Sequence, residues 1–146
     1  MKAREILAEK GTRVVTIHKD NLLVDVMSHF LVNQIGSLVV VDKYNKILGI
    51  VAPNDVLKAV HHNPESIATA RVSEIMSENV IVAGPDDDMD KLMAIMTENR
   101  VRHIPIIKDG KMAGLVSIGD VVKAQLTVQD VKINYLKDYI EGKYPA

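Results

Sequence analysis

The feature that most constrains this chain of 146 residues is an internal repeat. Residues of the same type recur at a spacing of 66 and then, after a predicted hairpin turn, at a spacing of 65. The matched pairs include Asp20 with Asp86, Met27 with Met93, Asn33 with Asn99, Gly49 with Gly114, Val51 with Val116, Asp55 with Asp120 and Lys58 with Lys123. One deletion in the turn explains the change of spacing, because turns tolerate length differences that strands do not. The chain therefore consists of two copies of one small unit.

Each copy is expected to have the element order β-α-β-β-α, which places the chain in the α/β class. Short β-branched and apolar runs predict strands, and apolar residues at helical spacing predict helices. The expected strands are 14–17, 37–41 and 47–51 in the first copy and 80–82, 101–107 and 112–116 in the second. Helices are expected over 22–31, where Asp20 or Asn21 can provide the cap and Gly36 ends the segment, and over 52–60, with counterparts in the second copy. Because neither copy can bury its own sheet, the two are expected to stack about a pseudo-twofold axis.

The repeat also sets the expected domain boundaries. The first copy spans residues 5–63, a linker follows over 64–72, and the second copy spans 73–125. Residues 126–146 are predicted to form a C-terminal helical extension with an apolar stripe at helical spacing, made of Val128, Val131, Tyr135 and Tyr139. This stripe can pack on the short helix expected over residues 1–10 or form a dimer contact, and the sequence leaves both interpretations open.

Composition excludes several classes of function. The chain has no cysteine, which excludes disulfides, thiolate metal sites and cysteine catalysis. A net charge of −1 and the scarcity of aromatic residues argue against nucleic-acid binding. No window approaches 18 uncharged apolar residues, so no membrane span is expected and a cytoplasmic location is predicted. No nucleophile and base are arranged for catalysis, and an enzyme is not expected.

The polar residues that could bind a ligand lie at strand ends in the second copy. Ser117 and Asp120 follow one strand and open a helix, and Arg102 and His103 precede the neighbouring strand. A carboxylate in this position can accept hydrogen bonds from ribose hydroxyls, and an arginine beside a histidine can bind phosphate. The alternatives are that Asp120 is a plain helix cap and that the basic pair is merely exposed.

The first copy lacks most of these groups. Gly36 and Ser37 stand where the second copy has the basic pair, and Ala52 replaces the serine, so that only Asp55 is retained. We therefore expect two unequal sites, the better one in the second copy. Pro105 removes a ladder donor and predicts an edge strand or a bulge.

Three other groups have simpler interpretations. Asp86, Asp87 and Asp88 are expected to stabilise a helix start rather than bind Mg²⁺. The adjacent His61 and His62 are expected at a solvated helix end rather than at a metal. The methionines at helical spacing, Met89, Met93 and Met96, are expected in the core.

The motif Gly114 to Asp120, its weaker copy Gly49 to Asp55 and the segment His103 to Ile107 resemble the cystathionine-β-synthase (CBS) domain. The resemblance covers about residues 5 to 125, and the whole chain is similar to small stand-alone bacterial CBS-pair proteins. It implies a tandem CBS-domain pair, called a Bateman module, which binds an adenosine nucleotide in the cleft between its repeats and dimerises through its helices.

The resemblance also implies residue roles. Asp120 would hold the ribose, Ser117 the ribose or phosphate, and Arg102 and His103 the phosphate. The implied nucleotide-binding set is completed by Thr12, Arg13, Val14, Ile104, Pro105, Ile118 and Gly119, and a second site would involve Ser37, Ala52, Asp55 and Val80. The expected ligand is AMP, with ADP, ATP, NAD, NADH and S-adenosylmethionine as alternatives, and the expected partners are a second copy of the chain and a regulated protein of unknown identity. The alternative function is a structural or dimerisation module without a ligand.

Overall fold

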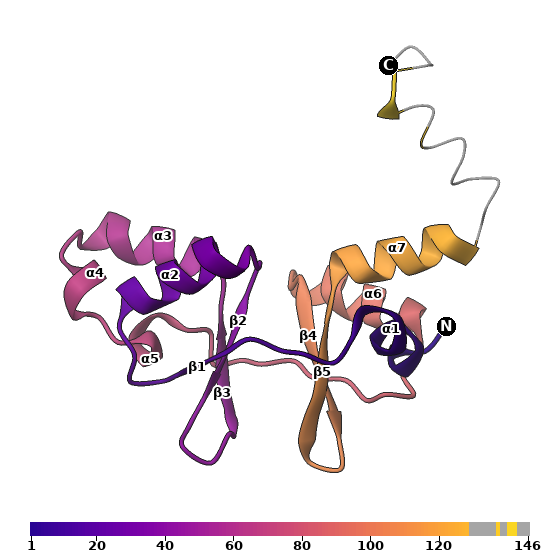
Figure 1. The fold of residues 1–146 in the computed structure, drawn as a ribbon, viewed down its shortest axis with the longest axis horizontal. Helices are drawn as coiled ribbons and strands as arrows, with labels where there is room; N and C mark the ends of the chain where they lie inside the picture. The colour runs from indigo at the N-terminus through magenta and orange to yellow at the C-terminus, as the bar shows by residue number, and fades with distance from the viewer. Residues whose placement is uncertain (129–136, 138–139, 143–146) are drawn as a thin grey trace. The chain divides into compact units, whose positions relative to one another are not determined.

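The computed structural model describes residues 1–128, 137 and 140–142 of the chain (Figure 1). It confirms a mixed α/β fold built from tandem repeats. The chain forms two compact units, which we call the central unit, Arg13–Ile81, and the terminal unit, which joins Met1–Thr12 to the chain from Val82 onward. In Figure 1 the indigo helix α1 (Ala3–Lys10) accordingly lies among the orange elements of the terminal unit. The division differs from the sequence repeat, because the first helix packs with the second copy.

The central unit is built on a three-stranded sheet in the order β1-β2-β3. β1 runs parallel to β2, and β2 runs antiparallel to β3. The elements are β1 (Thr16–His18), α2 (Leu23–Asn33), β2 (Leu38–Val41), β3 (Ile47–Val51), α3 (Pro53–His62), α4 (Ser66–Thr69) and α5 (Val72–Ile75). The apolar core of this unit consists of Ile17, Val26, Leu38, Val40, Val51 and Val72.

The terminal unit has a two-stranded antiparallel sheet with α1, α6 and α7 packed around it. Its elements after α1 are α6 (Met89–Asn99), β4 (His103–Lys108), β5 (Lys111–Ser117) and α7 (Ile118–Val128). Met96 is buried and Met89 and Met93 pack against the same core, which confirms that the methionine stripe is structural. The apolar stripe predicted beyond Val128 lies outside the described residues.

The strand expected over 80–82 is not formed, and proline explains why. In the central unit Lys19 N–H donates to Val41 O at 3.1 Å and Val39 N–H donates to Val15 O at 3.4 Å. The residues at the corresponding positions of the second copy are Pro85 and Pro105, which have no N–H to donate. Of this strand only an isolated parallel bridge between Ala83 and Ile106 is formed. β4 is therefore an edge strand, and its pairing with β5 has a register shift after Ile106.

Several local predictions need correction. Neither Asp20 nor Asn21 caps α2; the helix begins after Leu22, whose N–H donates to Asp25 at 2.9 Å. The same helix ends before Gln34, which adopts a left-handed conformation at φ 51°, and not at Gly36. The predicted linker over 64–72 contains α4 and the start of α5.

Among the described residues, no helix combines the length and the apolar character needed to cross a bilayer.

Candidate functional site

Ser117 and Asp120 form a reciprocal hydrogen-bonded pair where β5 passes into α7. The Ser117 N–H donates to Asp120 Oδ2 at 2.8 Å, and the Asp120 N–H donates to Ser117 Oγ at 3.1 Å. This is a capping box, with serine as the cap and the acidic residue on the third helical position. Capping is therefore part of the role of Asp120, although serine rather than aspartate occupies the cap position. Both contacts leave the second carboxylate oxygen, Oδ1, uninvolved.

Lys10 is a member of this site that sequence reasoning missed. Its Nζ donates to Asp120 Oδ2 at 2.5 Å and to the Leu115 carbonyl at 2.8 Å. The two side chains are 33% and 21% exposed, so the ion pair is partly shielded from water. The residues of the pair are separated by 110 positions in the sequence, and only the packing of α1 on β5 brings them together.

The basic pair lies beside the capping box. His103 is paired with Ser117 across the β4–β5 ladder, and the Ile118 N–H donates to the Arg102 carbonyl at 2.8 Å. Arg102 is exposed and His103 is half-buried. The terminal unit thus brings together the four polar residues that the sequence singled out, together with Lys10. Their role in binding stays a prediction.

Electrostatics give this cluster a positive character. Burial lowers the pKa of His103, the positive charges of Lys10 and Arg102 lower it further, and the opposing effect of Asp120 does not restore it. Partial burial would raise the pKa of Asp120, but hydrogen bonds from Lys10 and Ser117 outweigh it, and this pKa is lowered overall. At neutral pH the cluster therefore combines two cations, one carboxylate and an uncharged imidazole.

The other residues of the predicted binding set are more dispersed. Ile104 is fully buried in the core and Pro105 is also buried, so each can offer a ligand mainly its backbone. Ile118 is 41% exposed on the first turn of α7. Gly119 lies beside it, where an added Cβ would meet Ser117 Oγ at 3.6 Å, an ordinary contact. Thr12 and Arg13 are exposed and Val14 is half-buried; Thr12 belongs to the terminal unit, the other two to the central unit.

The predicted second site retains only its carboxylate. Asp55 Oδ2 accepts the Ala52 N–H at 2.8 Å, which repeats half of the capping box seen at Asp120. Ala52 has no hydroxyl to complete it, and the described residues offer Asp55 no ion pair. Ser37 is 4% exposed, and its hydroxyl finds no hydrogen-bond partner within the described part of the chain. Val80 is half-buried.

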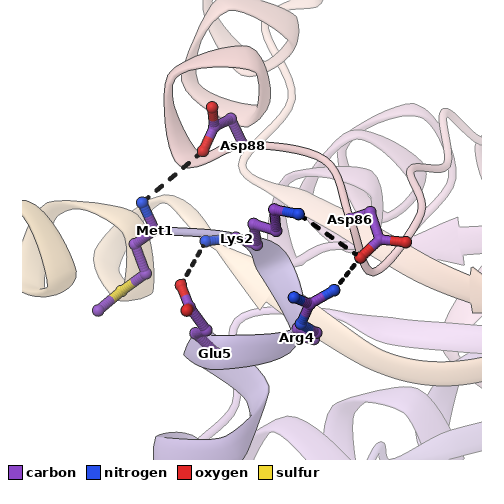
Figure 2. Close-up of polar contacts among 6 residues, drawn as sticks. All are labelled: Met1, Lys2, Arg4, Glu5, Asp86 and Asp88. Atoms are coloured by element: carbon purple, nitrogen blue, oxygen red, sulfur yellow. Dashed lines mark hydrogen bonds and ion pairs between the residues drawn. The ribbon is translucent and has the colours of Figure 1, made fainter.

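The described residues contain no cluster of three potential metal ligands. Asp86 pairs with Arg4 and Lys2, and Asp88 pairs with the N-terminal ammonium at 3.7 Å, as Figure 2 shows. Asp87 accepts from Lys91 at 2.8 Å. The carboxylates of Asp86 and Asp88 therefore tie the N-terminal segment to the start of α6, whereas that of Asp87 pairs with Lys91 of α6. His61 and His62 are exposed in the last turn of α3, as expected.

The fold and the site define a class: a tandem α/β module in which a strand end and a helix start present a carboxylate among basic groups. The chain belongs to the CBS-domain family, because the family model for the CBS domain matches residues 3–62 and 72–127. The match covers both copies of the repeat, so the resemblance inferred from the sequence is confirmed.

Individual relatives agree with this assignment. The mitochondrial CBS domain-containing protein CBSX3 of Arabidopsis thaliana is 35% identical over 86% of this chain, which spans 63% of that protein's length. The crystal structure of a CBS-domain containing protein from Agrobacterium tumefaciens is 36% identical, with a TM-score of 0.81 over 85% of this chain and 92% of that one. The CBS domain pair of protein MJ0100, solved with 5′-methylthioadenosine and S-adenosyl-L-methionine, has a TM-score of 0.77 at 22% identity, over 88% and 98% of the two chains. The last likeness concerns the fold alone.

Proposed function

We propose that this protein is a regulatory module that binds an adenine nucleotide, AMP in the first instance, without turning it over. The observation that carries the proposal is the cluster of Ser117, Asp120, Arg102 and His103 at one strand end of the terminal unit. Asp120 Oδ1 takes no part in the capping contacts and can accept a ribose hydroxyl. The helix start and the basic side chains suit a phosphate.

The ligand class has independent support. The protein MJ0100, which shares this fold, was solved with two adenosine-containing ligands. ADP, ATP, NAD, NADH and S-adenosylmethionine remain the alternatives to AMP. Binding would act by shifting the population of conformations that a partner recognises, because a ligand can bias an equilibrium only by its differential affinity. A regulated partner protein and a cytoplasmic location remain predictions.

Isothermal titration calorimetry with AMP, ADP, ATP, NAD, NADH and S-adenosylmethionine tests the proposal. Asp120→Asn is the informative variant, because an amide oxygen can still accept the Ser117 N–H while the charge is lost. We expect AMP binding to weaken at least about tenfold, the loss of one charged hydrogen bond. Asp55→Asn is the matched control and should change the affinity less than about twofold. Absence of binding by every ligand would contradict the proposal.

A second candidate, a module whose main role is self-association, is favoured by exposed apolar helix surface. Leu31 and Val32 on α2 are 77% and 80% exposed, and Leu57 on α3 is 69% exposed. We propose that these residues contribute to a homodimer, because neighbouring exposed apolar side chains such as Leu31 and Val32 mark interaction surfaces. Sedimentation equilibrium should give a dimer for the wild type, and Leu31→Glu with Val32→Glu should give a monomer. A monomeric wild type would contradict the proposed homodimer.

A further inference from the structure

Lys10 lies within the proposed nucleotide site, beside Asp120. Its ammonium lies 2.5 Å from the carboxylate that would hold the ribose, and it also adds to the positive field that lowers the pKa of His103. A ligand held by Asp120 would therefore be bound close to the ammonium of Lys10.

Lys10 is presented by a helix that is fixed to the terminal unit along its whole length. At the start of α1 the Ala3 and Arg4 N–H groups donate to the Asp87 and Pro85 carbonyls, both at 2.9 Å. Figure 2 shows the ion pairs of Met1, Lys2 and Arg4 with the acidic segment before α6. These contacts hold the start of the helix against the loop that leads into α6.

The middle and the end of α1 are held as well. Leu7 packs so closely over β5 that a Cβ added to Gly114 would lie 2.6 Å from its Cδ2. Gly11, at φ 97°, ends the helix directly after Lys10. The fold thus fixes the helix that carries Lys10, and the ammonium is held at Asp120 by its two hydrogen bonds.

The central unit has the corresponding helix without the lysine. α5 and Met76, the residue that follows it, cover β3 as α1 covers β5, and a Cβ added to Gly49 would lie 2.7 Å from Met76 Sδ. α5 ends at Ile75, however, and the chain continues into a bridge between Ser77 and Ile50. Leu7 corresponds to Met76, because each packs over the equivalent glycine of its unit. Past Leu7, α1 continues for three more residues, and this added turn places Lys10 at Asp120. The cation is a specific addition to the terminal unit.

We propose that Lys10 is a specificity-determining residue that makes this site select nucleosides bearing an anionic group over uncharged or cationic ones. This inference deepens the proposed function and rests on it. With Lys10 and Arg102 against the single carboxylate of Asp120, the cluster carries a net positive charge and attracts a phosphate, because opposite charges attract strongly where water is partly excluded. An uncharged thioether gains nothing from the ammonium, and a sulfonium is repelled by it.

The test compares AMP with 5′-methylthioadenosine, which keeps the adenosine and lacks the phosphate, by calorimetry on the full chain. The wild type should bind AMP more tightly. Lys10→Met should weaken AMP about tenfold and change 5′-methylthioadenosine less than about twofold, while Lys10→Arg should retain most of the preference. Lys91→Met, which breaks the Lys91–Asp87 pair elsewhere in the same unit, is the matched control and should leave both affinities unchanged.

The outcomes separate the two proposals. If the wild type binds neither compound nor any other adenine nucleotide, the proposed function fails and this inference fails with it. If the wild type binds AMP but Lys10→Met leaves the ratio of the two affinities unchanged, the proposed function stands and the role of Lys10 is overturned. Circular dichroism of folded Lys10→Met excludes unfolding as the cause of lost binding; if that variant does not fold, an unchanged ratio in Lys10→Gln overturns the role equally.

Discussion

The central and terminal units carry the same carboxylate at the same place and differ in what surrounds it. Asp55 and Asp120 each accept the N–H of the residue three positions earlier, at 2.8 Å in both units. In the terminal unit the Ser117 hydroxyl also accepts the Asp120 N–H, and Lys10 forms an ion pair with the Asp120 carboxylate. In the central unit Ala52 stands in place of the serine. A repeated fold thus keeps the structural hydrogen bond in both copies, whereas the groups suited to a ligand occur in one.

The largest expected effect on stability concerns Gly49 and Gly114, the two glycines over which Met76 and Leu7 pack. A Cβ at Gly49 would lie 2.7 Å from the Ser77 backbone oxygen, which cannot move cheaply, whereas the three atoms nearest to a Cβ at Gly114 all belong to the side chain of Leu7. Gly49→Ala should destabilise by about 3 kcal/mol and Gly114→Ala by about 1 kcal/mol, within the range for overpacked cores. Urea unfolding of the two variants measures this difference. Equal losses would contradict the expectation that the Ser77 backbone yields less easily than the Leu7 side chain.

The capping boxes should give a smaller effect with opposite signs in the two units. Ser117→Ala removes the hydroxyl that accepts the Asp120 N–H, and should cost about 1 kcal/mol of unfolding free energy. Ala52→Ser supplies the missing hydroxyl beside Asp55 and should stabilise by up to about 1 kcal/mol. Urea unfolding monitored by circular dichroism compares both with the wild type. A neutral Ser117→Ala would show that the box contributes nothing to α7.

The smallest expected effect is a pH dependence specific to the terminal unit. Burial, with Lys10 and Arg102 nearby and Asp120 opposing, holds the pKa of His103 in the folded protein below its ordinary value of 6.5. The unfolded chain therefore binds this proton more readily, so the contribution of His103 is full above about pH 6.5 and decreases as the pH falls below it. Thermal unfolding between pH 7.5 and 5.5 should show a shallower slope for His103→Gln. An identical slope in the two proteins would contradict a lowered pKa of His103 in the folded state.

Much of this architecture could be predicted from the sequence, because it depends on local pattern. Apolar runs and turn residues located the hairpins that became β2–β3 and β4–β5, and the matched aspartates indicated two related sites. The missing first strand of the second copy could also have been foreseen, since Pro85 and Pro105 remove the donors that Lys19 and Val39 provide in the first copy.

The rest depends on contacts between distant segments. No local signal indicates that the first helix packs on the second copy, or that Lys10 reaches Asp120 across 110 residues. The close approach of Leu7 to Gly114 is visible only once the strand and the helix are placed together. The start of α2 was mispredicted because Asp20 and Asn21 are ordinary capping residues, whereas the helix uses Asp25 from within its own first turn.

Counting the bound AMP per chain tests the central claim, that one copy alone carries a competent site. Calorimetry at protein concentrations well above the Kd should give one AMP per chain for the wild type and for Asp55→Asn, with Kd values within about twofold of each other, whereas Asp120→Asn should have a Kd at least about tenfold weaker. Two AMP molecules per chain, with one lost in each variant, would contradict the inequality of the two units.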